Sequence, residues 1–212
     1  MKNFIITKND LGRFLEGIVK KKNVIAPVKN EFDDIFLLPV EKAEDIILDY
    51  ENTINSAKEY FFPDSECMFT FKSQSASSIK SSGLKEDLLI FGLRGCDAKA
   101  LVLLDKFFKR NFEDNLYLER RKKSILITLS CPRYWEECFC GSVKSGPLLE
   151  YGFDIQLIPI NDRYIVQIGT EKGVLLLEDF RKFFKPANDE DIKRLSELKK
   201  NLKAEKPKFD LD

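Results

Sequence analysis

The 212-residue sequence contains no histidine. Catalytic Ser-His-Asp and Cys-His arrangements need an imidazole, and so do the zinc sites that combine nitrogen with sulfur ligands. General base chemistry by histidine is excluded for the same reason. Any metal or reactive group in this protein must therefore be held by sulfur, by carboxylate or by the backbone.

An excess of charge of either sign is also absent, since 35 Lys and Arg residues are balanced by 35 Asp and Glu residues. A neutral chain has no overall field that would hold it on nucleic acid or on an anionic membrane. No apolar run approaches the roughly 20 residues that span a bilayer, and the N-terminal apolar stretch is too short for a signal peptide. We therefore expect a cytoplasmic protein that binds no nucleic acid and does not insert into a membrane.

The sequence lacks the glycine-rich motifs that bind nucleotides. No Gly-x-Gly-x-x-Gly follows a predicted strand. Residues 141–146 have the spacing of half a phosphate-binding loop, but Pro147-Leu148 stands where that motif needs Lys followed by Ser or Thr. Nucleotide hydrolysis is therefore rejected.

The apolar runs that are present predict an α/β domain. Residues 88–93 and 124–130 have strand length, and a helix with Asp97 as its N-cap is expected over 98–108 between them. Strand, helix and strand in this order predict a parallel βαβ unit. We expect a mixed sheet with a parallel βαβ core, flanking helices and cysteines at the C-terminal strand ends, with an α+β arrangement as the alternative.

Other patterns predict hairpins and one exposed loop. The apolar runs 24–28 and 35–40 predict one hairpin, and the runs 155–160 and 164–168 predict a second. Residues 73–82 contain six serines, and a polar stretch of this kind has nothing to bury. We expect this serine-rich segment to be an exposed loop.

Four of the five cysteines form the pattern that points to chemistry. Cys96 follows the first strand of the βαβ unit, Cys131 follows the second, and Cys138 and Cys140 stand in a loop soon after. Open α/β sheets bind their ligands at the carboxyl ends of their strands. Four thiolates without a nitrogen ligand suit an iron–sulfur cluster or a Cys₄ zinc site.

The spacing of these cysteines leaves alternatives open. The pair Cys138 and Cys140 matches neither the Cys-x₂-Cys of a zinc knuckle nor the cysteine run of ferredoxins. The thiols can instead be small buried apolar side chains, or Cys138 or Cys140 can be the nucleophile of a thiol enzyme or redox sensor. For the isolated Cys67 we expect a buried core residue.

Two arginines adjoin the proposed ligands, Arg94 next to Cys96 and Arg133 next to Cys131. A cluster held by four thiolates carries net negative charge, which nearby arginines offset while they tune its reduction potential. We expect both arginines to support the cluster from outside its ligand set. The alternative for each is a solvated surface position or an ordinary ion pair.

Several short motifs occur in a fixed order along the chain: Phe61-Phe62-Pro63 with Glu66, residues 91–98, residues 114–117 with Arg120-Arg121, Cys131, residues 138–142, residues 152–155 and residues 170–173. Together they resemble the N-terminal domain of a family that includes the A subunit of anaerobic sulfite reductase and the sulfhydrogenase beta subunit. The resemblance covers roughly residues 55–180. Several motifs in order are more specific than any one of them.

Members of that family are iron–sulfur electron-transfer subunits. The resemblance implies one iron–sulfur cluster, expected to be [4Fe–4S], bound by Cys96, Cys131, Cys138 and Cys140. It also implies a non-catalytic subunit of a hydrogenase- or reductase-type oxidoreductase complex, which relays electrons between a catalytic subunit and a flavin-containing or ferredoxin-like subunit. The alternative is a Cys₄ zinc-stabilised assembly module without a redox role.

Family members usually continue into a ferredoxin-like domain, which has no counterpart in this sequence. Either the sequence is part of a longer protein, or a separate ferredoxin-like subunit supplies the remaining clusters. We expect residues 1–186 to form a single α/β cluster-binding domain. Residues 187–212 are expected to form a charged C-terminal helix and tail that docks on this domain or on a partner.

Overall fold

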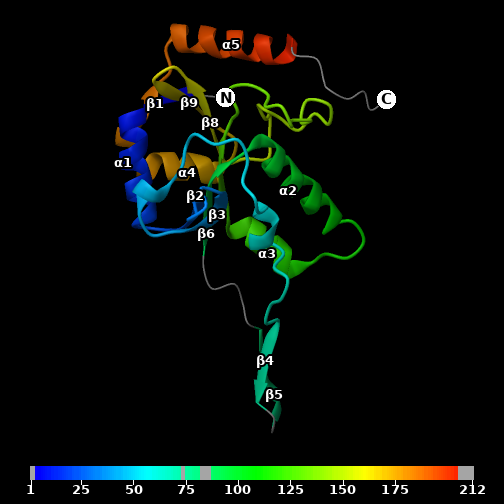
Figure 1. Cartoon of the computed structure of the whole chain (residues 1–212). Helices are drawn as coiled ribbons and strands as arrows, with labels where there is room; N and C mark the ends of the chain where they lie inside the picture. The colour runs from blue at the N-terminus through cyan, green and yellow to red at the C-terminus, as the bar shows by residue number, and fades with distance from the viewer. Residues whose placement is uncertain (1–2, 73–74, 82–86, 205–212) are drawn as a thin grey trace.

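The fold has three layers, with a mixed eight-stranded sheet between two layers of helices (Figure 1). The structure, a computed structural model, describes residues 3–72, 75–81 and 87–204. The strands of the large sheet are β1 (Asn3–Thr7), β2 (Asn23–Lys29), β3 (Ile35–Val40), β6 (Leu88–Leu93), β7 (Ile125–Leu129), β8 (Ile155–Ile160), β9 (Arg163–Ile168) and β10 (Lys185–Pro186). The α/β prediction is therefore confirmed.

The sheet has a parallel centre and antiparallel edges. Its strand order is β10-β1-β9-β8-β7-β6-β2-β3, and the pairs β2–β6, β6–β7 and β7–β8 are parallel. The β2–β3 and β8–β9 pairs are antiparallel and adjacent in the chain, so both predicted hairpins are confirmed. The parallel β6–β7 pair confirms the predicted βαβ unit.

Helices cover both faces of the sheet: α1 (Lys8–Val19), α2 (Gly95–Phe107), α3 (Asn115–Lys123), α4 (Glu171–Asp179) and α5 (Asp189–Ala204), with short 3-10 helices η1 (Ala43–Asp45), η2 (Ala57–Tyr60) and η3 (Arg181–Phe183). Phe14 of α1 and Leu177 of α4 share one core with alternate strand residues such as Phe91. Leu101 of α2 and Tyr117 of α3 pack in a second core on the opposite face. The central strands are continuously apolar because they are buried on both faces.

The C-terminal helix α5 packs on the sheet through its apolar stripe. Leu195 is buried against Ile158, Ile160 and Ile165 of the β8–β9 hairpin. The predicted helix is therefore present, and its apolar stripe is used within the chain. The docking role of residues 187–212 stays a prediction, and residues 205–212 lie outside the described residues.

The serine-rich segment contradicts its prediction over residues 75–81. These residues form β5 (Ser75–Ser81), which pairs with β4 (Phe69–Lys72) in an antiparallel hairpin that extends away from the large sheet (Figure 1). A strand satisfies its backbone hydrogen bonds through its neighbour, so it needs no apolar side chains to form. Residues 73–74 and 82 of the predicted loop lie outside the described residues.

Helix α2 begins earlier than predicted. Its N-cap is Arg94, whose backbone is extended and whose side chain makes no capping hydrogen bond, so Asp97 lies inside the first turn. A Cβ at position 95 would lie only 3.1 Å from the carbonyl oxygen of Pro147, so glycine, which has no Cβ, permits this early start. Cys96 therefore stands in the first turn of α2 rather than before it.

No helix in the part of the chain that the structure describes is long and apolar enough to cross a bilayer.

Two glycines within helices should respond in opposite directions to replacement by alanine. A Cβ on Gly173 of α4 would lie 2.1 Å from the carbonyl oxygen of Asp154, whereas a Cβ on Gly12 of α1 would meet nothing within 4 Å. We expect Gly173→Ala to lower the free energy of unfolding by about 1–3 kcal/mol through overpacking. Gly12→Ala should raise it by about 0.5–1 kcal/mol. Urea denaturation measures both, and a neutral Gly173→Ala would contradict the close α4–sheet contact.

Candidate functional site

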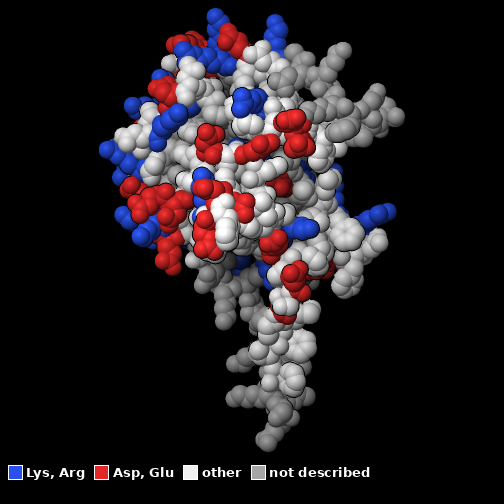
Figure 2. All heavy atoms as spheres, viewed as in Figure 1, with Lys and Arg blue, Asp and Glu red and all other residues white. Residues whose placement is uncertain are grey.

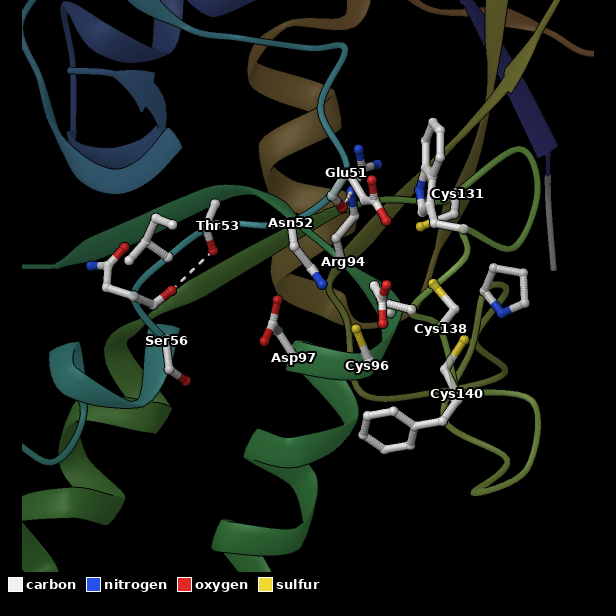
Figure 3. Close-up of a pocket in the computed structure, with 17 residues that line it drawn as sticks. Glu51, Asn52, Thr53, Ser56, Arg94, Cys96, Asp97, Cys131, Cys138 and Cys140 are labelled. Carbon is white, nitrogen blue, oxygen red and sulfur yellow. Dashed lines mark hydrogen bonds between the residues drawn. The ribbon is translucent and has the colours of Figure 1, made fainter. Parts of the chain in front are cut away.

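A cavity of about 360 Å³ lies beyond the C-terminal ends of β6 and β7 (Figure 3). Three segments of the chain form its wall: a strap of residues 51–56, the start of α2 with the preceding Arg94, and the loop 131–147. The carboxyl ends of neighbouring parallel strands meet at this edge, which is where open α/β sheets place their ligands.

All four predicted ligand cysteines line this cavity. Cys96 comes from the first turn of α2, Cys131 follows the end of β7, and Cys138 and Cys140 come from the loop after it. Figure 3 shows their thiol groups pointing toward the same part of the cavity. Cys131 is buried, and the other three are partly exposed. The structure therefore brings together thiols from separate segments of the chain.

The fifth cysteine contradicts its prediction. Cys67 is exposed rather than buried in a core. It lies after η2, where the chain leaves the large sheet toward the β4–β5 hairpin, and its thiol donates to the carbonyl oxygen of Phe69 at 3.6 Å. A position outside the packed layers gives a small side chain nothing to bury against.

The cavity thiols oppose one another's ionisation. Burial raises the pKa of Cys96 to about 12, and the charges of Asp97, Cys131 and Cys140 add to that increase. Burial also raises the pKa of Cys140 to about 11, together with the charges of Cys138 and Cys131. Like charges in one low-dielectric site disfavour the charged form. Four thiolates can therefore share this cavity only when a cationic group offsets their charge.

Two side chains favour the thiolate form of Cys131. Burial raises the pKa of Cys131, while the positive charge of Arg94 and the neighbouring indole of Trp135 act in the opposite direction. The indole N–H can only donate, so it stabilises negative charge on the sulfur. Trp135 is itself stacked under Arg133, whose guanidinium carbon lies 4.5 Å from the ring centroid.

Arg94 is the buried cation of the site, with a relative exposure of 4%. Its Nε donates to the carbonyl oxygen of Glu51 at 3.2 Å, its Nη1 donates to that of Leu129 at 3.0 Å, and its Nη2 donates to that of Tyr50. Its guanidinium also lies over the Tyr50 ring, 3.8 Å from the centroid. Among the described residues, no carboxylate forms a salt bridge with it, and its positive charge acts on both Asp97 and Cys131 of the cavity.

The two predicted supporting arginines differ in position. Arg94 lines the cavity together with the thiols, whereas Arg133 is exposed and is not among the lining residues. The prediction placed both beside the cluster because both adjoin cysteines in sequence. The direction of each side chain depends on its backbone, which neighbours in sequence do not determine.

A bulge at the end of β6 aims Arg94 at its partners. Gly92 has a φ of 84°, and the β6–β7 register shifts between Phe91 and Leu93. The hydroxyl of Tyr50 donates to the Gly92 carbonyl oxygen at the same point. A bulge re-directs the side chains that follow it, and glycine tolerates the positive φ that this requires.

The strap that forms one wall of the cavity was not predicted. Asn55 binds both backbone groups of Leu37 on the edge strand β3, at 2.8 Å and 3.0 Å, and the Ile54 amide donates to the Ile35 carbonyl oxygen at 2.8 Å. These bonds cover part of the free edge of β3. Strap residues such as Asn52 and Thr53 line the cavity, yet no local sequence signal marks them, because a distant strand holds them there.

The surface that leads to the strap is acidic. Residues 31–66 contain eleven Asp and Glu residues and two Lys residues, all of them exposed. Figure 2 shows acidic side chains gathered across the middle of the face viewed there. This surface repels anions. Arg94 is the basic residue among those that line the cavity, so it is the group that can offset negative charge there.

No group of three or more His, Cys, Asp or Glu side chains in the described part of the chain is arranged so that it could hold a metal ion. The thiols share a cavity, and the assignment of Cys96, Cys131, Cys138 and Cys140 as ligands stays a prediction. The structure shows that the four cysteines line the same cavity, and it does not show them arranged as metal ligands.

The fold and the cavity define an α/β domain with a thiol-lined site at the carboxyl ends of its parallel strands. No family model matches the chain. Over 166 residues the chain is 29% identical to sulfhydrogenase 2 subunit beta of Pyrococcus furiosus, and the match covers 78% of the chain. It covers 48% of that protein, so the chain spans about half the length of this curated relative. The chain is thus similar to a subunit of a sulfhydrogenase.

The raised pKa values predict slow alkylation of the cavity thiols in metal-free, reduced protein. Because Cys96 has a pKa of about 12 against an ordinary value of 9.0, its thiolate fraction near pH 8 is roughly a thousandfold smaller. We expect iodoacetamide to label the exposed Cys67 first, and labelling of Cys96 and Cys140 to rise about tenfold per pH unit up to their pKa values. Peptide mass spectrometry measures this order. Equal labelling of Cys96 and Cys67 in folded protein would contradict it, and urea-unfolded protein is the control.

Proposed function

We propose that this protein is an electron-transfer subunit of a cytoplasmic oxidoreductase of the hydrogenase or reductase type. In this proposal Cys96, Cys131, Cys138 and Cys140 hold one iron–sulfur cluster, of the [4Fe–4S] type. The observation that carries the proposal is the meeting of four thiols from separate segments in one cavity, beside the buried Arg94. The similarity to a sulfhydrogenase subunit supports the same conclusion.

The chemistry of the cavity fits such a cluster. The chain contains no histidine, and the cavity is lined by four thiols together with the carboxyl groups of Glu51, Asp97 and Glu137. Soft thiolates favour iron–sulfur or zinc over harder ions. A thiolate cluster is anionic, which matches the positive charge of Arg94. When bound, an iron–sulfur cluster accepts and releases single electrons.

The residues around the thiols would tune and shield the bound group. At Cys131, the charge of Arg94 and the neighbouring indole of Trp135 lower the electrostatic cost of negative charge on the sulfur. The strap, whose Glu51 and preceding Tyr50 accept hydrogen bonds from Arg94, forms one wall of the cavity. Charge, hydrogen bonds to sulfur and solvent exposure are the means by which a protein sets the potential of a cluster.

The proposed partners are other subunits of an oxidoreductase complex, including a ferredoxin-like or flavin-containing subunit. The relative is named as a subunit, and the chain matches about half of its length. One cluster relays electrons only when a donor and an acceptor lie close to it, so this role requires a complex. The proposal includes no nucleic acid and no catalytic residue.

Iron and acid-labile sulfide, measured on protein purified without oxygen, test the proposal. We expect about four irons per chain for a [4Fe–4S] cluster, and loss of most of that iron in Cys138→Ser. The matched control is Cys67→Ser, which removes an exposed cysteine outside the cavity and should keep the iron.

Other metal contents would replace this proposal. Stoichiometric zinc that depends on Cys138 would favour the Cys₄ assembly module without a redox role. Folded protein that binds no metal under these conditions would leave a thiol-dependent enzyme or redox sensor.

Removing the charge of Arg94 should lower the reduction potential of the bound cluster. Reduction adds negative charge, which a nearby cation favours, so Arg94→Gln makes the electron harder to add. We expect a shift of on the order of 60 mV to lower potential, which corresponds to a roughly tenfold change in a one-electron equilibrium. Arg133→Gln, at the exposed arginine, should shift the potential by much less.

Arg94→Lys separates the charge of this residue from its hydrogen bonds. Lysine keeps the positive charge but cannot reproduce the bonds to three carbonyl oxygens. A potential near that of the wild type in Arg94→Lys, together with the shift in Arg94→Gln, would identify charge as the cause. Redox titration followed by electron paramagnetic resonance gives these values, and equal shifts in Arg94→Gln and Arg133→Gln would contradict the expectation.

A further inference from the structure

A buried amide stands in the middle of the apolar strand β8. Gln156 has a relative exposure of 1%, and its neighbours Ile155, Leu157 and Ile158 are equally buried. Burying an amide is unfavourable unless its hydrogen bonds are made. The surroundings of Gln156 supply those bonds from elsewhere in the chain.

The Gln156 side chain makes four hydrogen bonds. Its Oε1 accepts from the Leu149 amide at 2.9 Å and from the Ser130 hydroxyl at 3.2 Å. Its Nε2 donates to the Leu149 carbonyl oxygen at 3.1 Å and to Oε1 of Gln167 at 3.1 Å. An amide side chain has two acceptor and two donor positions, so the capacity of Gln156 is filled.

Two of these partners, Ser130 and Leu149, lie at the two ends of the loop that contains Cys138 and Cys140. Ser130 immediately precedes Cys131, and Leu149 lies shortly after Cys140. Gln156 binds both backbone groups of Leu149, as a neighbouring strand would. One side chain thus bonds to both the start and the end of this loop, and the Ser130 amide also donates to the Leu157 carbonyl oxygen of β8 at 2.9 Å.

The end of the loop lies directly against the cavity thiols. At Gly146 the position of a Cβ would be 3.6 Å from the Cys140 sulfur and 3.6 Å from the Cys96 backbone nitrogen. The next residue, Pro147, lies against the start of α2 at Gly95. Movement of Leu149 would therefore displace the chain that holds Cys140 beside Cys96.

We infer that Gln156 is a positioning residue, which fixes both ends of the loop 130–149 on β8 so that Cys131 and Cys140 face the same cavity. The inference deepens the proposed function and rests on it where a bound cluster is concerned. Gln156 does not line the cavity, so it acts through the backbone that carries the thiols. Changes in residues that support metal ligands typically cost roughly 10–100-fold in metal affinity.

The neighbouring Gln167 supplies a matched control. It is also buried, it belongs to the same network, and its Nε2 donates to Asn3 at 3.1 Å. Its side-chain hydrogen bonds reach Gln156 and Asn3 rather than the loop. Gln167→Leu and Gln156→Leu therefore make the same chemical change, and only the second removes the side-chain hydrogen bonds to Ser130 and Leu149.

The experiment compares iron release to a chelator from wild type, Gln156→Leu and Gln167→Leu, all purified without oxygen. We expect release at least tenfold faster from Gln156→Leu, with altered electron paramagnetic resonance g-values, and release within about twofold of wild type from Gln167→Leu. Urea denaturation of each protein measures the accompanying loss of stability. Equal effects of the two variants, or unchanged release from Gln156→Leu, would overturn the positioning role.

A second measurement on metal-free protein makes the inference independent of iron. A short dithiol-specific cross-linker should bridge Cys131 and Cys140 less efficiently in Gln156→Leu than in wild type or Gln167→Leu, as read by peptide mass spectrometry. If wild type binds no iron but this difference is found, the proposed function fails and the positioning role stands. Equal bridging in all three proteins overturns the positioning role. Gln156→Asn, which keeps the amide but shortens its reach, replaces Gln156→Leu if that variant does not fold.

Discussion

The buried guanidinium of Arg94 is the interaction on which the cavity depends. It joins the end of β6 to the end of β7 through Leu129, and to the strap through Glu51 and the preceding Tyr50. Its planar arrangement of donors suits three carbonyl oxygens in a way that a lysine does not. The same guanidinium places a positive charge beside the thiols, whereas the exposed surface of residues 31–66 is mostly negative.

The parallel sheet and the loop contribute differently to the site. β6 and β7 are parallel neighbours, so their carboxyl ends lie side by side and place Cys96 near Cys131. Cys138 and Cys140 lie in a loop, so the pairing of the strands does not determine their position. Their location depends on the amide of Gln156 and on the close approach of Gly146 to Cys96 and Cys140, both of which are contacts between segments. The spacing of the four cavity cysteines therefore depends on loop packing against the edge of the sheet.

The sequence predicted the sheet centre well and the connections poorly, for identifiable physical reasons. The runs that became β6 and β7 are continuously apolar because both of their faces are covered, and this signal is local. The strand β5 has no such signal, since its pairing with β4 uses backbone groups that every residue carries. The position of Cys67 depended on where the chain leaves the sheet, and the start of α2 depended on how closely Gly95 approaches Pro147.

The sequence by itself determined the class of fold, the absence of histidine chemistry and the four cysteines that can act together. Periodicity and composition carry these properties, because burial on one or both faces of an element selects residue types locally. Only the tertiary structure decided that Arg94 faces the cavity while Arg133 does not, and that an unpredicted strap closes one wall. Those outcomes depend on hydrogen bonds and packing between residues far apart in the chain, which no local pattern encodes.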